Sequence, residues 1–163
     1  YSPVRLVVLM LPQDTSADQI SLVRTAAGIS YLVSLITLAV FIIVIRILNW
    51  PTRSGAFNVW VNLPTFDPTA GGDVVERLER DARFNIALGF LLPFLTPAVI
   101  TAAGSLFGTL SLTSPQTLIW TVAAWSFLPA SLFMRGIAMG RIAAMIEDKR
   151  RSNARAEEEY LAA

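Results

Sequence analysis

The chain has 163 residues, 54% of them hydrophobic and only 15% charged, and its 13 basic residues almost balance its 12 acidic residues. This composition favours a membrane protein over a soluble domain, and the balanced charge argues against a nucleic-acid partner, because phosphate backbones are bound by clustered, uncompensated cations. The sequence contains no Cys and no His, which excludes Ser-His-Asp and Cys-His catalysis, iron–sulfur ligation by thiolates, and the usual zinc and copper ligand sets.

Residues 1–25 form an N-terminal segment before the first long apolar stretch. Its opening run, YSPVRLVVLMLPQ, is too short to span a bilayer. The pattern leaves open a strand, an interfacial segment or the end of a preceding part of the chain. Ser16 with Gln19 has the spacing of a capping box at a helix start, and Thr15 with Asp18 offers the same spacing one residue earlier. A helix that begins here and continues through the apolar stretch would have roughly 30 residues and a length of about 45 Å.

Residues 26–45, AAGISYLVSLITLAVFIIVI, carry no charged side chain and are followed at once by Arg46. A helix needs about 20 apolar residues to cross the hydrocarbon core of a bilayer, so this stretch predicts a first transmembrane helix. The alternative is a buried helix of a soluble protein. Amphipathic helices would then have to cover it, and the chain has too few polar residues for that.

The connection at residues 46–84 begins with an irregular part, PTRSGAFNVWVNLPTFDPTAGG, that is rich in Pro and Gly. Its aromatic residues make it too apolar for a free linker, so we expect it to dip into the membrane interface or to pack against a partner. Trp50 and Trp60 are assigned to this interface, where amphipathic rings are favoured. Lipid-facing or packing roles are the alternative for such aromatic residues.

The second part of this connection predicts an amphipathic helix. Asp73 followed by Glu76 marks its start as a second capping box. The sequence DVVERLERDARF then alternates apolar and charged residues with a helical period, and the helix should continue directly into the second span. The apolar residues of this amphipathic pattern are Val74, Val75, Leu78, Ala82 and Phe84.

The second predicted span, residues 85–107, combines prolines with glycines. Pro93 and Pro97 each remove a backbone donor, so the helix should bend near its middle and its freed carbonyl groups need other donors. We expect Thr96 to supply one of them. At the end of the span, a GxxxG spacing predicts a face on which another helix packs closely. Its two glycines are Gly104 and Gly108. A functional hinge or a cavity at the prolines is the alternative.

Residues 117–134, TLIWTVAAWSFLPASLFM, predict the third transmembrane helix, which is ended by Arg135. The stretch is close to the shortest that spans a bilayer. Trp120, near its start, is assigned to the interface with the same alternatives as the other tryptophans. The sequence therefore predicts an all-α integral membrane protein with three transmembrane helices in a membrane domain at residues 26–134.

Residues 135–163 are rich in helix formers and predict a helix that leaves the membrane. Gly136 and Gly140 repeat the GxxxG spacing at its start, and Glu147 with Arg151 has the i,i+4 spacing of a stabilising ion pair. Two interpretations stay open: a solvated tail that continues the third span, or a docking helix for another subunit. The apolar contacts of a docking helix would be Ile137, Ile142, Met145 and Ile146.

The positions of the basic residues predict the orientation. Arg46 and Arg135 directly follow the first and third spans, and eleven basic residues lie in the loop and the tail. Only Arg5 and Arg24 lie on the other side. Because basic residues accumulate on the cytoplasmic side, we expect the N-terminus outside and the C-terminus in the cytoplasm, and we assign the chain to a bacterial inner or intracytoplasmic membrane.

The three spans contain no charged side chain, which argues against a proton-coupled transporter, a pump or a voltage sensor. Nothing in the sequence predicts an enzyme, a catalytic or metal-binding residue, or a cofactor. The predicted function is that of a non-catalytic accessory or scaffold subunit of a larger membrane complex, with other membrane-protein subunits and the lipid bilayer as partners. The alternative is a small homo-oligomeric transporter or channel component with its pore around the proline-kinked second span.

Overall fold

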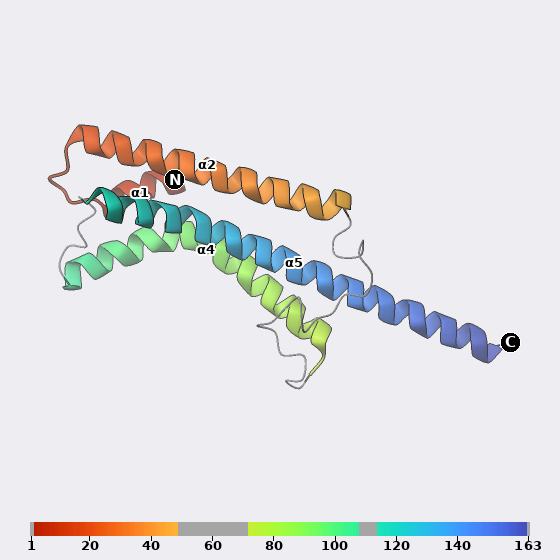
Figure 1. The fold of residues 1–163 in the computed structure, drawn as a ribbon. Helices are drawn as coiled ribbons and strands as arrows, with labels where there is room; N and C mark the ends of the chain where they lie inside the picture. The colour runs from red at the N-terminus through yellow and green to blue at the C-terminus, as the bar shows by residue number, and fades with distance from the viewer. Residues whose placement is uncertain (1, 49–71, 108–113, 163) are drawn as a thin grey trace.

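The computed structural model describes residues 2–48, 72–107 and 114–162. Across these ranges the chain is helical and forms no strand (Figure 1). The elements in chain order are α1 (Pro3–Val7), the 3₁₀ turn η1 (Val8–Met10), α2 (Ala17–Leu48), α4 (Val74–Phe107) and α5 (Pro115–Ala162). Three of them, α2, α4 and α5, are long and apolar enough to cross a membrane. The expected all-α chain with three such helices is therefore confirmed.

The helix α5 is the centre of the arrangement, because both α2 and α4 pack on it. Figure 1 shows α2 and α5 running in the same direction and α4 running in the opposite direction. Alternating directions are what three successive crossings of a bilayer require. The helices are longer than the apolar stretches that predicted them, because each continues into a less apolar segment at one or both ends.

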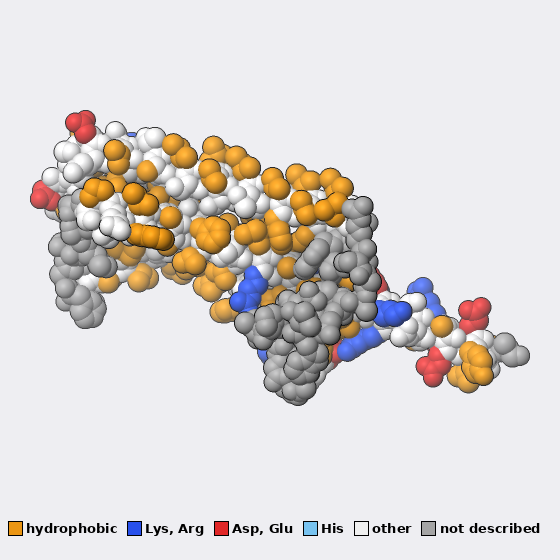
Figure 2. Space-filling model, in the orientation of Figure 1, with side chains coloured by type: hydrophobic (Ala, Val, Ile, Leu, Met, Phe, Trp, Pro, Cys, Tyr) orange, Lys and Arg blue, Asp and Glu red, His pale blue; other side chains and the backbone are white. Residues whose placement is uncertain are grey.

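The helix α2 begins where its capping residue predicts. The hydroxyl oxygen of Ser16 accepts a hydrogen bond from the backbone N–H of Gln19 at 3.3 Å, which satisfies one of the free donors at a helix N-terminus. The helix then runs for 32 residues, close to the length expected. Its buried residues fall on one narrow stripe: Val23, Ala27, Ser34 and Ile45. Most of its other large apolar side chains are exposed, and Figure 2 shows hydrophobic side chains spread along the surface of the bundle.

The helix α4 begins directly after Asp73, whose Oδ1 atom accepts a hydrogen bond from the N–H of Val75 at 3.3 Å. Asp73 therefore caps the helix as expected, although no hydrogen bond from Glu76 completes the capping box among the described residues, and the continuous passage from the amphipathic segment into the second span is confirmed. Of the apolar residues in this pattern, Val75, Leu78 and Ala82 are buried, whereas Phe84 is 65% exposed. It follows the buried Ala82 by two residues, which is about 200° around a helix of 3.6 residues per turn.

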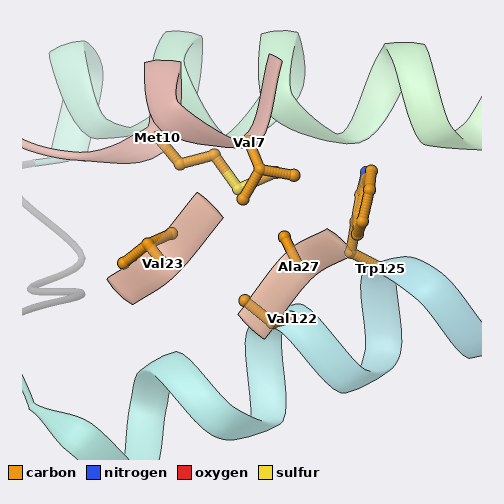
Figure 3. Packing of buried hydrophobic residues seen from close by; sticks show 6 residues of the cluster. All are labelled: Val7, Met10, Val23, Ala27, Val122 and Trp125. Carbon is orange, nitrogen blue, oxygen red and sulfur yellow. The ribbon is translucent and has the colours of Figure 1, made fainter. Parts of the chain in front are cut away.

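The N-terminal segment folds back against the long helices. Figure 3 shows Val7 and Met10 beside the residues of α2 and α5 with which they pack. This buried cluster consists of Val7, Met10, Val23, Ala27, Val122 and Trp125. The hydroxyl of Thr101 on α4, which donates to the carbonyl oxygen of Pro97 at 2.8 Å, also lies 3.2 Å from the carbonyl oxygen of Leu9. Among the forms left open for this segment, the strand is therefore wrong: the segment is helical and packed.

A second buried cluster joins the beginning of α4 to the middle of α5. It consists of Val75, Leu78, Ala82, Met139, Ile142 and Ala143. Ile142 is 1% exposed, so its assignment as a contact for another subunit is wrong: it packs within its own chain. From Asp148 onwards the described residues of α5 are exposed, and Figure 1 shows this end of the helix projecting beyond the others. The tail therefore continues the third span as one helix, with Arg151 paired to Glu147 as expected.

Candidate functional site

The most distinctive local structure is the proline-containing part of α4, where it meets α5. Pro93 and Pro97 lie inside the helix and are buried, and Figure 1 shows that α4 changes direction near its middle. Because Pro97 has no N–H group, the carbonyl oxygen of Pro93 lacks its normal helical donor. The indole Nε1 of Trp125 donates to this oxygen at 3.0 Å in a buried hydrogen bond. A side chain of α5 thus replaces the hydrogen bond that α4 has lost.

Thr96 does not fill the place that the sequence suggested. Its hydroxyl donates to the carbonyl oxygen of Leu92 at 2.8 Å. This carbonyl group is not one that a proline frees, because the residue four positions after Leu92 is Thr96 itself, which has a backbone N–H. The hydroxyl therefore adds to a turn of α4 and leaves both proline-freed carbonyl groups, those of Gly89 and Pro93, to other donors. Trp125 was missed as a donor because nothing local in the sequence shows which carbonyl group its ring faces.

Two glycines allow α4 and α5 to approach closely. A Cβ atom on Gly136 would lie 2.7 Å from Cγ1 of Ile86 and 2.8 Å from the carbonyl oxygen of Ala82, closer than side chains are found. A Cβ atom on Gly89 would lie 3.0 Å from the carbonyl oxygen of Pro129. Each helix therefore contributes one glycine to the contact. The sequence pattern singled out Gly136 but not Gly89, which has no GxxxG partner.

The other glycines of the predicted packing motifs are placed differently. A Cβ atom on Gly140 would lie 3.8 Å from the Cβ of Ala82, an ordinary contact, so this position has room for a small side chain. Gly104 stands in the last turn of α4, and Gly108 lies outside the described residues. Close packing through the pair Gly104 and Gly108 therefore stays a prediction.

A cavity of about 250 Å³ lies beside Pro93, lined by residues of α2, α4 and α5. Its lining contains no charged side chain, and its polar groups are the hydroxyls of Tyr31, Ser34 and Ser126. The ring of Tyr31 lies 5.4 Å from that of Trp125, centroid to centroid. The remaining lining residues are Leu35, Leu38, Gly89, Phe90, Pro93, Phe94, Pro129, Ala130 and Phe133. This lining suits apolar contacts and offers no carboxylate or amine for acid–base chemistry.

The volume limits what this cavity holds. Pockets for drug-sized ligands measure roughly 300–1,000 Å³, so this cavity of about 250 Å³ is too small to enclose a large ring system such as a pigment macrocycle. In the parts of the chain that the structure describes, no group of three or more Asp and Glu residues is arranged to hold a metal ion. The chemistry available at this site is therefore apolar contact and hydrogen bonding.

The residues assigned to the interface lie at the ends of the apolar stretches where the structure describes them. Trp120 is 70% exposed near the start of α5. Arg46 is exposed in the last turn of α2, and Arg135 is exposed on α5. Trp50 and Trp60 lie outside the described residues.

An ion pair ties the beginning of α4 to the tail. Nη1 of Arg150 lies 2.8 Å from Oδ1 of Asp73. The hydrogen bond from Arg150, together with the one from the N–H of Val75, holds the pKa of the Asp73 carboxyl below its usual value of 3.8. One carboxylate therefore caps α4 and anchors α5 at the same time.

Comparison with known proteins does not assign the chain to a family. The chain matches no protein-family model, no curated protein and no solved structure. What the molecule does is therefore inferred from its three long apolar helices, the close contact of α4 with α5 and the cavity beside Pro93.

Proposed function

We propose that this protein is an integral membrane protein that acts as a non-catalytic accessory or scaffold subunit of a larger membrane complex. The supporting observation is the exposed apolar surface of its three long helices. In their most apolar windows, only 11% of α2, 17% of α4 and 28% of α5 is buried within the chain. A surface of this kind is stable only against lipid or against the helices of other proteins.

The helix α2 is the strongest candidate for contacts with another subunit. It touches the rest of the chain along a single stripe and presents apolar side chains around the rest of its circumference. Its large exposed side chains are Leu22, Ile29, Leu32, Val33, Leu35, Ile36, Val40, Ile42, Ile43, Val44, Ile47 and Leu48. A scaffold subunit uses such a face to pack against neighbours and leaves its other contacts to lipid.

The absence of charge favours a subunit that binds over one that catalyses or transports. The cavity has no charged lining residue, and the predicted spans contain no Asp, Glu, Lys or Arg. Intramembrane charges are the usual markers of proton relays and ion pathways. A role in assembly requires none of these groups.

The arrangement of α4 gives less support to a homo-oligomeric channel with a pore around the prolines. Pro93 and Pro97 are both buried, and the freed carbonyl group of Pro93 is bonded to Trp125 of the same chain. The irregular side of α4 is thus closed by α5. A pore built on this side would require the two helices to separate.

For the orientation, we propose that the N-terminus lies outside and that the tail of α5 lies in the cytoplasm. Three crossings leave the two ends of a chain on opposite sides, and the basic residues concentrate in the loop and the tail. Extraction of the native membrane with a mild detergent, followed by sizing of the intact particle, tests the proposed function. Stoichiometric companion proteins support it, and migration of the chain alone contradicts it.

A further inference from the structure

The side chain of Arg141 on α5 has a buried hydrogen-bond donor, its Nε atom, for which the described residues provide no acceptor. The residue is half-buried. Leaving a buried donor unpaired is costly, so such groups normally have a partner. Guanidinium groups bind phosphate oxygens through strong, charge-assisted hydrogen bonds. The unpaired atom therefore points to an anionic ligand at this position.

Arg141 lies near the end of α2. The rings of Tyr31 and Trp125 are in contact at 5.4 Å, and α2 and α5 run in the same direction (Figure 1). Arg46 follows Tyr31 by 15 residues and Gly140 follows Trp125 by 15 residues. At an equal rise per residue, Arg46 and Arg141 come to about the same level. This level is the end of the predicted first span, where the headgroups of a bilayer begin.

The same side of α5 leads from Arg141 back to the cavity. Ala130 and Phe133 line the cavity, and Ile137 and Arg141 follow them at steps of four residues, which keeps all four on one side of a helix. From Ala130 to Arg141 the helix rises about 17 Å at 1.5 Å per residue. Half of a hydrocarbon core of about 30 Å is about 15 Å. The distance from Arg141 to the cavity along α5 is therefore about the thickness of the hydrocarbon layer of one leaflet.

We propose that the surface running from this cavity to Arg141 binds one anionic phospholipid. The end of one acyl chain lies in the apolar cavity, and the phosphate accepts a hydrogen bond from Arg141, with Arg46 adding positive charge at the same level. The occupant is a lipid rather than a partner helix, because an apolar helix fills the cavity but leaves Arg141 unpaired. Basic sites between transmembrane helices on the cytoplasmic side bind anionic headgroups in this way. This inference rests on the membrane location proposed above.

The test uses the full chain reconstituted in vesicles of equimolar phosphatidylglycerol and phosphatidylcholine, extracted in detergent and analysed by native mass spectrometry. We expect one retained lipid per chain, with phosphatidylglycerol favoured at least fivefold. Arg141→Gln should abolish this preference, whereas Arg155→Gln in the exposed tail should keep it. Leu35→Trp at the cavity rim should remove the retained lipid altogether. Leu32→Trp is its matched control, because Leu32 is exposed on the same helix and does not line the cavity.

The results separate this inference from the proposed membrane location. Release of the chain from membranes by alkaline carbonate would contradict the location itself. A chain that stays in the membrane but retains both lipids equally, or keeps its preference after Arg141→Gln, would contradict the phospholipid site alone. Circular dichroism of each variant confirms that its helices are intact, and a variant that has lost helix is replaced by Arg141→Lys or Leu38→Phe, for which the same changes are expected in weaker form.

Discussion

The indole N–H of Trp125 on α5 donates to the carbonyl oxygen of Pro93 on α4 at 3.0 Å, an oxygen that Pro97 leaves without its helical donor. This bond joins α5 to α4 at the point where α4 lacks one of its own backbone hydrogen bonds. It explains how α4 keeps a bend in its middle without leaving the carbonyl group of Pro93 unpaired in an apolar environment, where such a group is costly.

Replacing Trp125 by Phe should destabilise the bundle. The ring remains, but the buried carbonyl oxygen of Pro93 loses its donor, so we expect the free energy of unfolding to fall by about 1–3 kcal/mol. Unfolding by sodium dodecyl sulfate in mixed micelles, followed by circular dichroism, measures the change. Trp120→Phe is the control, because Trp120 is 70% exposed and its replacement should leave the unfolding midpoint in place.

The variant Pro97→Ala should reduce the cost of losing the indole donor. Alanine at this position restores a backbone N–H that can bond to the carbonyl oxygen of Pro93. In a double-mutant cycle, Trp125→Phe should therefore cost less in the Pro97→Ala background than in the natural chain, by about 1 kcal/mol. Strictly additive effects of the two replacements would show that the indole bond does not compensate for Pro97.

The two glycines at the beginning of the tail should respond differently to alanine. Gly136→Ala places a Cβ atom against Ile86 and the backbone of Ala82, and such overpacking typically costs about 1–3 kcal/mol. Gly140→Ala meets only an ordinary contact at 3.8 Å, so the better helix propensity of alanine should leave stability unchanged or raise it by up to about 1 kcal/mol. Thermal unfolding in detergent compares the two variants. Equal losses would mean that Gly136 does not mark the close contact.

The local parts of this fold follow from local signals, and the contacts between distant residues do not. Ser16 and Asp73 each predict a helix start because a cap acts within a few residues. The contact of Trp125 with Pro93 joins residues 32 positions apart, and no spacing rule connects them. Phe84 was grouped with the apolar face because its side chain is apolar, although it lies about 200° around the helix from Ala82 and is 65% exposed.

The cavity and the N-terminal segment show the same limit. The prolines of α4 suggested a hinge or a cavity, yet the residues that complete the cavity come from α2 and α5. The short run that contains Val7 reads as apolar in the sequence, and its place in the core depends on three other helices. Both features arise only when the long helices pack together.

The ion pair between Asp73 and Arg150 should make the first turn of α4 sensitive to acid. Since the pKa of Asp73 is lowered in the folded chain, its contribution to stability is fully present above the usual value of 3.8 and is lost as the pH falls through the lowered value. Carboxyl ¹³C NMR of Asp-labelled protein should show this carboxyl titrating below 3.8, with Asp73→Asn to assign it. Arg150→Gln should move the titration upwards, and Arg155→Gln should not.

The orientation is open to a direct labelling test, because the natural chain contains no Cys. Leu161 near the C-terminus is 79% exposed, and Asp14 before α2 is also exposed. We expect a membrane-impermeant thiol reagent to label Asp14→Cys in intact cells and to label Leu161→Cys only after the cells are broken. The reverse pattern would invert the proposed topology.

The central claim, that the exposed apolar helices serve assembly, is tested most directly by native mass spectrometry of the tagged chain released from its own membrane in a mild detergent. A mock extraction from cells with the untagged chain identifies proteins that bind the resin alone. We predict a particle in which the chain is present with other membrane proteins in a fixed whole-number ratio. A particle that contains only this chain and lipid, as a monomer or as an oligomer of itself, would contradict the account.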